Sequence, residues 1–524
     1  MMMTKTMQGD LTEAYHSLVE IGLALSGRGD LDSLLETILI SAKRLANADG
    51  GTLYLAGDEG ALHYKMLHTT SLNLSVGGSS GKAPNFPPIP VSDIGSMAAF
   101  CAREKISLNI DDIYHNDQFD FSGPRKFDAA NGYRTRSMLA IPLIDHRSDT
   151  IGVLQLINAL DPATGEPVAF SPATQQLCEA LASQAAIAIS NRALVIQLEE
   201  LFLALITLIN NAIDEKSPYT GGHCNRVPEL TLMLAQAASE ADYGPLQNFH
   251  LTPDDLQELQ IASLLHDCGK IVTPIHVVDK ATKLETIFDR IELVETRFEV
   301  LLRDLEIELL KGNITQAEHD ERRTALLADR DFLRHANIGG ERMSPDDIAR
   351  VHRIAALQWQ PIGQETRPFL SGNEVENLTI VAGTLTGEER QIINHHITAT
   401  INMLEALPWP KHLRNVPEYA GGHHERMDGR GYPKGLKGNE MSVQARMLAI
   451  ADVFEALTAA DRPYKSGKTL SEALRIMKFL RDDNHIDPDL FDIFVREKIY
   501  LRYAEQFLPP EQIDDVSAAD LVAA

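Results

Sequence analysis

Residues 260–270 read QIASLLHDCGK, an apolar helical run that ends in an adjacent histidine and aspartate, His266 and Asp267. A carboxylate of this kind can bridge two metal ions while the neighbouring imidazole binds one of them. The dipeptide alone is weak evidence, because such pairs also occur by accident on protein surfaces. It indicates a metal site only if other segments bring matching ligands.

Four other segments do bring such ligands: HCNR at 223–226, INHHITAT at 393–400, HHERMDGRGYP at 423–433 and AIADVF at 449–454. Each is predicted to be a helix or a helix edge, and helical bundles build dinuclear metal sites from such elements. Two metal ions would lower the pKa of a bridging water, supply a hydroxide at neutral pH and clamp a phosphodiester for in-line displacement.

Composition limits the partners. A chain of 524 residues exceeds the usual size of one domain. The net charge of -26 argues against nucleic-acid polymers and anionic membranes. The start MMMTKTMQGD lacks a signal-peptide pattern, and the apolar stretch at 201–209 is short for a membrane span, so we expect a cytoplasmic protein. The cysteines, which predict neither disulfides nor a thiolate zinc site, are Cys101, Cys178, Cys224 and Cys268.

The first half of the chain predicts an α+β domain. Apolar residues at helical spacing over 10–48 precede the β-like runs GGTLYLA and ALHYKML. Two further apolar strands, SMLAIPLID and TIGVLQLIN, flank a turn that contains Asp145 and Ser148. An antiparallel sheet with helices is therefore expected.

A long connecting helix is predicted over 171–216. Its apolar residues alternate in steps of four and three, which is typical of a coiled-coil seam, although an amphipathic helix packed on its own domain would look similar. Beyond this helix the residue pattern predicts helices throughout, apart from the loop at 421–438. Within that region an apolar stripe from Ile287 to Leu309, followed by GN at 312–313, predicts a helical hairpin. The seam residues are Leu194, Leu198, Leu201, Leu205, Leu208 and Ala212.

Taken together, HxxR, HDxGK, a lone His, HHExxDGxGYP and a final Asp resemble the signature of HD-GYP domains over roughly residues 205–505. The resemblance implies an all-α HD-type fold, a metal cluster that often contains iron, and hydrolysis of cyclic di-GMP to pGpG or GMP. Manganese, nickel or zinc would also suit such ligands. Carried over by position, the implied ligands are His223, His266, Asp267, His396, His423, His424 and Asp452.

Of the adjacent His395 and His396, only one can face the metals, because successive helix residues point about 100° apart. His396 fits the family pattern. We expect two ions rather than three, because Tyr219, one turn before His223, is a poor ligand at neutral pH. The nearest upstream acids, Asp214 and Glu215, are separated from His223 by a proline and two glycines.

Substrate contacts are expected beside the ligands. Lys270 follows Asp267 by one helical turn and can donate to a phosphate oxygen, so both receive catalytic roles. Tyr432 offers a ring for a guanine base, although the glycines around it could simply form a tight turn, and the basic residues could be a solvated face. The expected contacts are Arg226, Lys270, Arg430, Gly431, Tyr432, Pro433, Arg446 and Arg462.

The chain departs from the HD-GYP pattern in two places. About a hundred residues, 279–385, are inserted between Asp267 and His396, and Glu455 replaces a common aspartate at a position expected to lie away from the ligands. Base identity stays open, so another cyclic dinucleotide such as cyclic GMP-AMP is an alternative substrate. A non-catalytic cyclic di-GMP receptor is the alternative from a different functional class.

The run FDAANGYRTRSMLAIPLIDHRSDTIGVLQLIN, followed by AFSP, resembles GAF domains over about residues 11–195. Asn158 and Phe170 match cyclic-nucleotide-binding members, but Ala159 replaces their lysine. The domain is expected to sense an unidentified small molecule or only to dimerise, within a homodimer. The expected organisation is a GAF domain at 11–195, a coiled-coil helix at 171–216, an HD-GYP domain at 217–505 and an acidic tail at 506–524.

Overall fold

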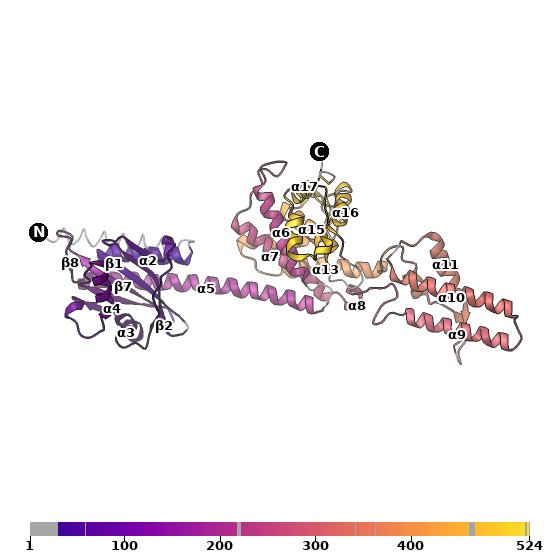
Figure 1. Cartoon of the computed structure of the whole chain (residues 1–524), viewed down its shortest axis with the longest axis horizontal. Coiled ribbons are helices and arrows are strands. Elements are labelled where there is room, and N and C mark those ends of the chain that lie inside the picture. The colour runs from indigo at the N-terminus through magenta and orange to yellow at the C-terminus, as the bar shows by residue number, and fades with distance from the viewer. Residues whose placement is uncertain are drawn as a thin grey trace. The chain divides into compact units, whose positions relative to one another are not determined.

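The computed structural model describes residues 30–57, 59–216, 222–340, 342–361, 363–460, 467–518 and 521–522 (Figure 1). Contacts divide the chain into two compact units, Met1–Phe202 and Leu203–Ala524.

The first unit is built on one antiparallel sheet with the strand order β3-β2-β1-β7-β6-β5, where β4 also pairs with β2 and β8 with β7. β6 and β7 are joined by a turn in which the Asp145 carboxylate accepts from the amides of Arg147 and Asp149. This confirms the predicted strand pair. The strands are β1 (Ala48–Ala56), β2 (Ala61–Thr69), β3 (Leu74–Val76), β4 (Ile89–Pro90), β5 (Leu108–Ile110), β6 (Met138–Ile144), β7 (Thr150–Leu160) and β8 (Pro167–Val168).

Helices cover the sheet with two separate apolar cores. α2 (Leu31–Ala46), capped by Asp30, packs with the first turns of α5 (Pro172–Lys216) in one core. α3 (Met97–Glu104) contributes to the other core. α4 (Ser122–Asn131) and two short 3-10 turns, η1 (Gly78–Ser80) and η2 (Ile113–His115), complete the described unit. The predicted α+β architecture is confirmed, whereas the part of the first predicted helix before residue 30 lies outside the described residues.

Helix α5 runs for 45 residues, as the periodic leucines predicted. Its seam leucines are exposed; Leu198 keeps 66% and Leu208 63% of its surface. By length and composition alone, Pro172–Ile213 could also cross a membrane, which is weak evidence by itself. The sequence expectation missed this because it measured only residues 201–209.

The second unit is helical around the ligand segments. α6 (His223–Glu240) packs on α7 (Pro253–Leu265) and α15 (Val443–Thr458), while α13 (Gly387–Glu405) packs on the 3-10 turn η3 (Cys268–Val272). Thr252 and Thr386 cap α7 and α13 through capping boxes. The other elements are α8 (Ile275–Val278), η4 (Lys411–Leu413), α14 (Val416–Gly421), η5 (Gly438–Glu440), α16 (Leu470–Asp482), α17 (Pro488–Arg496), α18 (Ile499–Phe507) and η6 (Pro510–Gln512).

The inserted segment forms a small helical body with its own core. α9 (Ile291–Leu310) and α10 (Gln316–Ile338) lie side by side as the predicted hairpin, although Ile287 precedes the helix and is almost fully exposed (Figure 1). His319 on α10 is buried and contacts Glu306 on α9. The rest of the insertion comprises α11 (Pro345–Ala355), α12 (Gly372–Leu378) and a two-stranded ribbon of β9 (Gln358–Trp359) and β10 (Arg367–Pro368).

The described residues of the segment expected as an acidic tail, 506–524, contact the helices of the second unit. Asp514 accepts hydrogen bonds from the amide and hydroxyl of Ser471 at the start of α16. Leu521 is buried, and its carbonyl accepts from Arg481. The described part of 506–524 therefore belongs to the helical unit.

Candidate metal centre

Five segments bring the seven predicted ligands together. His223 opens α6, His266 and Asp267 follow α7, and His396 lies in the middle of α13. His423 and His424 follow α14, and Asp452 lies on α15. The first four and His423 are buried, whereas His424 and Asp452 are partly exposed. His395 is exposed, which agrees with the choice of His396.

Six of the seven ligand residues form two groups of three, Asp267 joins the groups, and Asp452 Oδ1 lies 3.4 Å from Nε2 of His223. His223, His266 and Asp267 place one atom each within 4.8 Å of one another, and His396, His423 and His424 do the same. Asp267 Oδ2 lies 3.3 Å from Nε2 of both His223 and His266, while its Oδ1 lies 3.2 Å from Nε2 of His396. One carboxylate thus faces both groups.

Backbone carbonyls orient three of the imidazoles. Nδ1–H of His266 donates to the carbonyl oxygen three residues earlier at 2.7 Å, and His396 and His423 do the same at 2.6 Å. These bonds fix the tautomer that leaves Nε2 free to bind a metal, as outer contacts do in metal sites. The accepting residues are Ser263, Ile393 and Ala420.

The residues fit a divalent metal. Asp267 Oδ1 and His423 Nε2 are buried without a hydrogen-bond partner, which is costly unless an ion satisfies them. Burial opposes ionisation of Asp267, but Lys270 and His266 outweigh it and hold the pKa of this carboxyl well below its usual range. Burial, reinforced by His424 and His266, lowers the pKa of His423 and keeps its imidazole in the neutral, metal-binding form.

Glu455 supports the fourth imidazole, which corrects the expectation that it lies away from the ligands. It is buried on α15, one helical turn after Asp452. Its Oε2 accepts from Nδ1 of His223 at 2.5 Å, and its Oε1 accepts from Nε of Arg226 at 2.8 Å. The spacing of three residues from Asp452 was a usable signal, because such positions share a helix face.

Lys270 and Gly269 fit the turn after Asp267 closely. Lys270 Nζ lies 2.5 Å from Asp267 Oδ2. A Cβ on Gly269 would lie 2.0 Å from the carbonyl oxygen of His396, so only glycine lets η3 approach α13 this closely. The amide of Gly269 also donates to Thr400 Oγ1.

The loop at 421–438 places Tyr432 beside the ligands. Its ring stacks on His424 with centroids 4.8 Å apart, and the following bond to Pro433 is cis. A Cβ on Gly431 would lie 2.4 Å from the amide nitrogen of Arg426. Burial, with Asp452 and Asp267 nearby, raises the pKa of the Tyr432 phenol to about 12, so it stays protonated.

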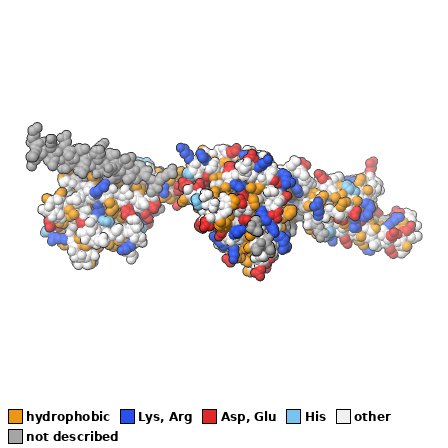
Figure 2. Space-filling model, turned by 90° about the horizontal axis from the view of Figure 1, so that it is seen from above, with side chains coloured by type: hydrophobic (Ala, Val, Ile, Leu, Met, Phe, Trp, Pro, Cys, Tyr) orange, Lys and Arg blue, Asp and Glu red, His pale blue; other side chains and the backbone are white. Residues whose placement is uncertain are grey.

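The three predicted arginine contacts that the structure describes pair with acidic residues. Arg226 pairs with Glu455, and Arg446 pairs with Asp487 at the start of α17. Arg430 pairs with Asp428, and its side chain keeps 70% of its surface. Arg462 lies outside the described residues. On the face shown in Figure 2, basic and acidic side chains are interspersed.

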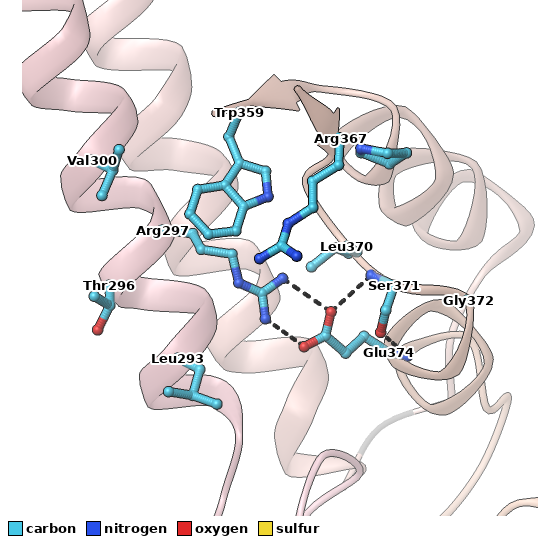
Figure 3. A pocket seen from close by; sticks show the side chains of 11 residues that line it. Leu293, Thr296, Arg297, Val300, Trp359, Arg367, Leu370, Ser371, Gly372 and Glu374 are labelled. Carbon is cyan, nitrogen blue, oxygen red and sulfur yellow. Dashed lines mark hydrogen bonds and ion pairs between the residues drawn. The ribbon is translucent and has the colours of Figure 1, made fainter. Parts of the chain in front are cut away.

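A separate groove of about 600 Å³ lies within the insertion (Figure 3). It runs between α9 and the segment that joins β9 to α12, with Trp359 and Arg367 on one side. Arg297 and Glu374 form a two-bond ion pair across its floor. None of the predicted site residues lines this groove.

Two protein families match the sequence. The GAF domain family matches residues 30–189, and the HD domain family matches residues 333–490. The chain combines a GAF domain with an HD domain. The HD match contains His396, His423, His424 and Asp452, while the other three predicted ligands precede it.

Curated relatives are similar over parts of the chain. A cyclic di-GMP phosphodiesterase of Pseudomonas aeruginosa is 49% identical over 152 residues, which cover 29% of this chain and 34% of the relative. A 3′3′-cGAMP-specific phosphodiesterase of Vibrio cholerae is 48% identical over 81 residues (16% and 19%), and a cyclic di-GMP phosphodiesterase of Thermotoga maritima is 34% identical over 133 residues (24% and 36%). The chain thus spans about a fifth to a third of each relative.

Proposed function

We propose that this protein is a metal-dependent phosphodiesterase that hydrolyses a cyclic dinucleotide, with cyclic di-GMP as the first candidate and pGpG, GMP or both as products. The observation that carries the proposal is the pair of three-residue groups joined by Asp267, with Lys270 beside the joining carboxylate. Such a donor set suits a phosphodiester, because two adjacent ions can hold its oxygens during an in-line displacement.

The HD domain implies a divalent metal. The seven predicted ligands would hold it, and it would supply Lewis-acid polarisation of the phosphodiester and acidify a water molecule. Lys270 has three N–H donors, so one can hold Asp267 while another donates to a phosphate oxygen as negative charge grows there.

The proposal includes two metal ions per chain, with iron as the first candidate for their identity. Each group of three ligands suits one ion, with Asp267 shared. Tyr219 lies outside the described residues, so the argument against a third ion still rests on sequence spacing. Metal analysis of anaerobically purified protein should approach two per chain. A reproducible value of three that falls to two in Glu215→Ala would contradict this count.

The relatives support both cyclic di-GMP and 3′3′-cGAMP as substrates, since both appear among their named activities. The experiment is turnover of each dinucleotide by protein loaded with iron, manganese, nickel or zinc, with Asp267→Ala as control. Faster hydrolysis of 3′3′-cGAMP would favour the second candidate. Tight binding of cyclic di-GMP without hydrolysis under every metal would leave the receptor alternative.

Regulation by the GAF domain, dimerisation through α5 and a cytoplasmic location belong to the same proposal. The GAF ligand is unidentified. Asn158 bonds to Tyr133 and to the backbone of Arg136, and Phe170 lies in the sheet core, so both residues that match cyclic-nucleotide-binding members serve the fold. This favours a ligand other than a cyclic mononucleotide, or none.

A further inference from the structure

The last residue of α5 contacts the turn that follows the Asp267 carboxylate. Lys216 Nζ donates to the backbone carbonyl oxygens of Lys270 at 3.2 Å, Ile271 at 2.5 Å and Thr273 at 2.6 Å. An ammonium has three N–H donors, so these contacts use all of them. One side chain therefore binds three of the four carbonyls from residue 270 to residue 273.

These carbonyls lie at the end of a short helix, and among them that of Lys270 also accepts from the amide of Thr273. η3 ends at Val272, and the carbonyls of its last turn have few N–H donors within the turn to satisfy them. A cation at a helix C-terminus is favoured because the carbonyl dipoles point toward it. The Lys216 ammonium thus caps the C-terminal end of η3.

The capped turn is held on its other side by α13. Gly269 donates its amide to Thr400 Oγ1 and sits against the carbonyl of His396. In contrast, Ile271 and Val272 are exposed, with 42% and 57% of their surface accessible. Hydrophobic packing therefore does little to hold this end of the turn, and the Lys216 contacts supply the main polar attachment that the structure shows there.

We propose that Lys216 is a positioning residue that transmits displacement of α5 to Lys270 and Asp267, and so sets the turnover rate. The proposal rests on the proposed phosphodiesterase function. Lys216 Nζ donates to the carbonyl oxygen of Lys270, and the ammonium of Lys270 contacts Asp267 Oδ2. A shift of the helix end would therefore move the proposed phosphate donor, and small misplacements of such groups slow enzymes strongly.

The first test compares Lys216→Met with Lys216→Arg and with Lys411→Met, which removes an exposed lysine elsewhere in the same unit. We expect Lys216→Met to keep its metal content and KM while kcat falls about tenfold. Lys216→Arg, which can still donate to carbonyls, should restore most of kcat, and Lys411→Met should change nothing. If Lys216→Met loses its metal, Lys216→Gln, which keeps two uncharged donors, replaces it.

The second test asks whether the helix acts through Lys216. Leu205 lies eleven residues before Lys216, about 16 Å along a helix, so independent effects should add. We expect Leu205→Glu to change kcat in the wild-type background and to have no further effect in Lys216→Met. Additive effects, or an unchanged kcat in Lys216→Met, would overturn the proposal.

Hydrogen exchange separates this proposal from the function it rests on. Amides of residues 268–273 should exchange faster in Lys216→Met than in wild type, whether or not a dinucleotide is hydrolysed. If wild-type protein shows no turnover but this exchange rises, the phosphodiesterase proposal fails and the attachment stands without a catalytic role. Unchanged exchange would show that the contacts do not hold the turn.

Discussion

At the scale of single residues, four of the five imidazoles of the centre have a second nitrogen that is already bonded. Three Nδ1–H groups bind carbonyls of their own helical turns, and His223 alone depends on a side chain from another helix. Local carbonyls come with the helix itself, whereas Glu455 is 232 residues from His223 in sequence. Orientation of His223 is therefore the most vulnerable to substitution.

Replacement of His396 should remove the metal from its group, while replacement of its neighbour should not. His396→Ala deletes a buried candidate ligand, and His395→Ala deletes an exposed side chain on the same helix. We expect His396→Ala and Asp267→Ala to lose metal and turnover with the helical circular dichroism signal retained. Equal metal content in His396→Ala and His395→Ala would contradict the assignment.

Glu455→Gln should weaken metal binding through His223. The amide cannot accept from both His223 and Arg226 as the carboxylate does, so the imidazole loses its fixed orientation. Changes of this kind cost about 10- to 100-fold in metal affinity. Competition with a chelator measures it, and Glu455→Asp, which keeps the charge, is the control. An affinity in Glu455→Gln equal to wild type would rule out this role.

The seven candidate ligands could be predicted from the sequence because they lie in short, strongly patterned segments. The spacing of Glu455 from Asp452 could place it on the ligand face, but its contact with His223 could not be predicted, because it arises from α6 packing on α15. The engagement of Arg226 and Arg446 with acidic partners was missed for the same reason. Charge near a loop indicates a binding face only when nearby acids do not already pair with it.

At the scale of elements, the insertion has both a core and an anchor. Phe298 and Phe369 are fully buried between its helices. Lys280 is buried and pairs with Glu389 in the first turn of α13, the helix that carries His396. The hairpin was predictable from periodicity, but this attachment was not, because Lys280 and Glu389 are 109 residues apart.

Acid should loosen the insertion through Glu374. Burial opposes ionisation of this residue, but hydrogen bonds from Arg297 and the Ser371 amide outweigh it and lower its pKa (Figure 3). A depressed pKa in the folded state means that the stabilisation is complete above the unfolded-state value of about 4.3 and is lost as pH falls through the lower folded value. Hydrogen-exchange protection of residues 291–378 should therefore drop in that range.

Glu374→Gln should lower the stability of the insertion by about 2 kcal/mol at neutral pH, because it leaves the partly buried Arg297 without its charge partner. It should also flatten the acid response, once exchange rates are corrected for intrinsic pH effects. Glu299→Gln on α9, the helix that carries Arg297, removes an exposed carboxylate and should leave both the stability and the acid response unchanged. If Glu374→Gln loses hydrogen-exchange protection in acid as the wild type does, another carboxyl group is responsible for the acid response.

At the scale of the whole molecule, the sequence predicted both units and the helix that joins them in the chain. Chain length, hydrophobic periodicity and motif spacing can all be read directly from the order of the residues. What covers the exposed side of α5 could not be predicted in the same way. Exposed leucines at four-three spacing suit a second copy of the helix, and a continuous apolar composition also suits a lipid surface. The two interpretations predict different effects of charged substitutions at the exposed leucines.

We expect a dimer in detergent-free solution that charged substitutions in the seam dissociate. Leu198 and Leu205 keep 66% and 50% of their surface in the single chain, and burying such a leucine against a partner is worth about 2 kcal/mol. Leu198→Glu with Leu205→Glu should therefore give a monomer by light scattering at micromolar concentration. Glu199→Gln, on the same exposed stretch, should stay dimeric. A wild-type monomer, or a dimer that survives both charges, would contradict the coiled coil, and sedimentation of wild type with membranes would favour the lipid reading.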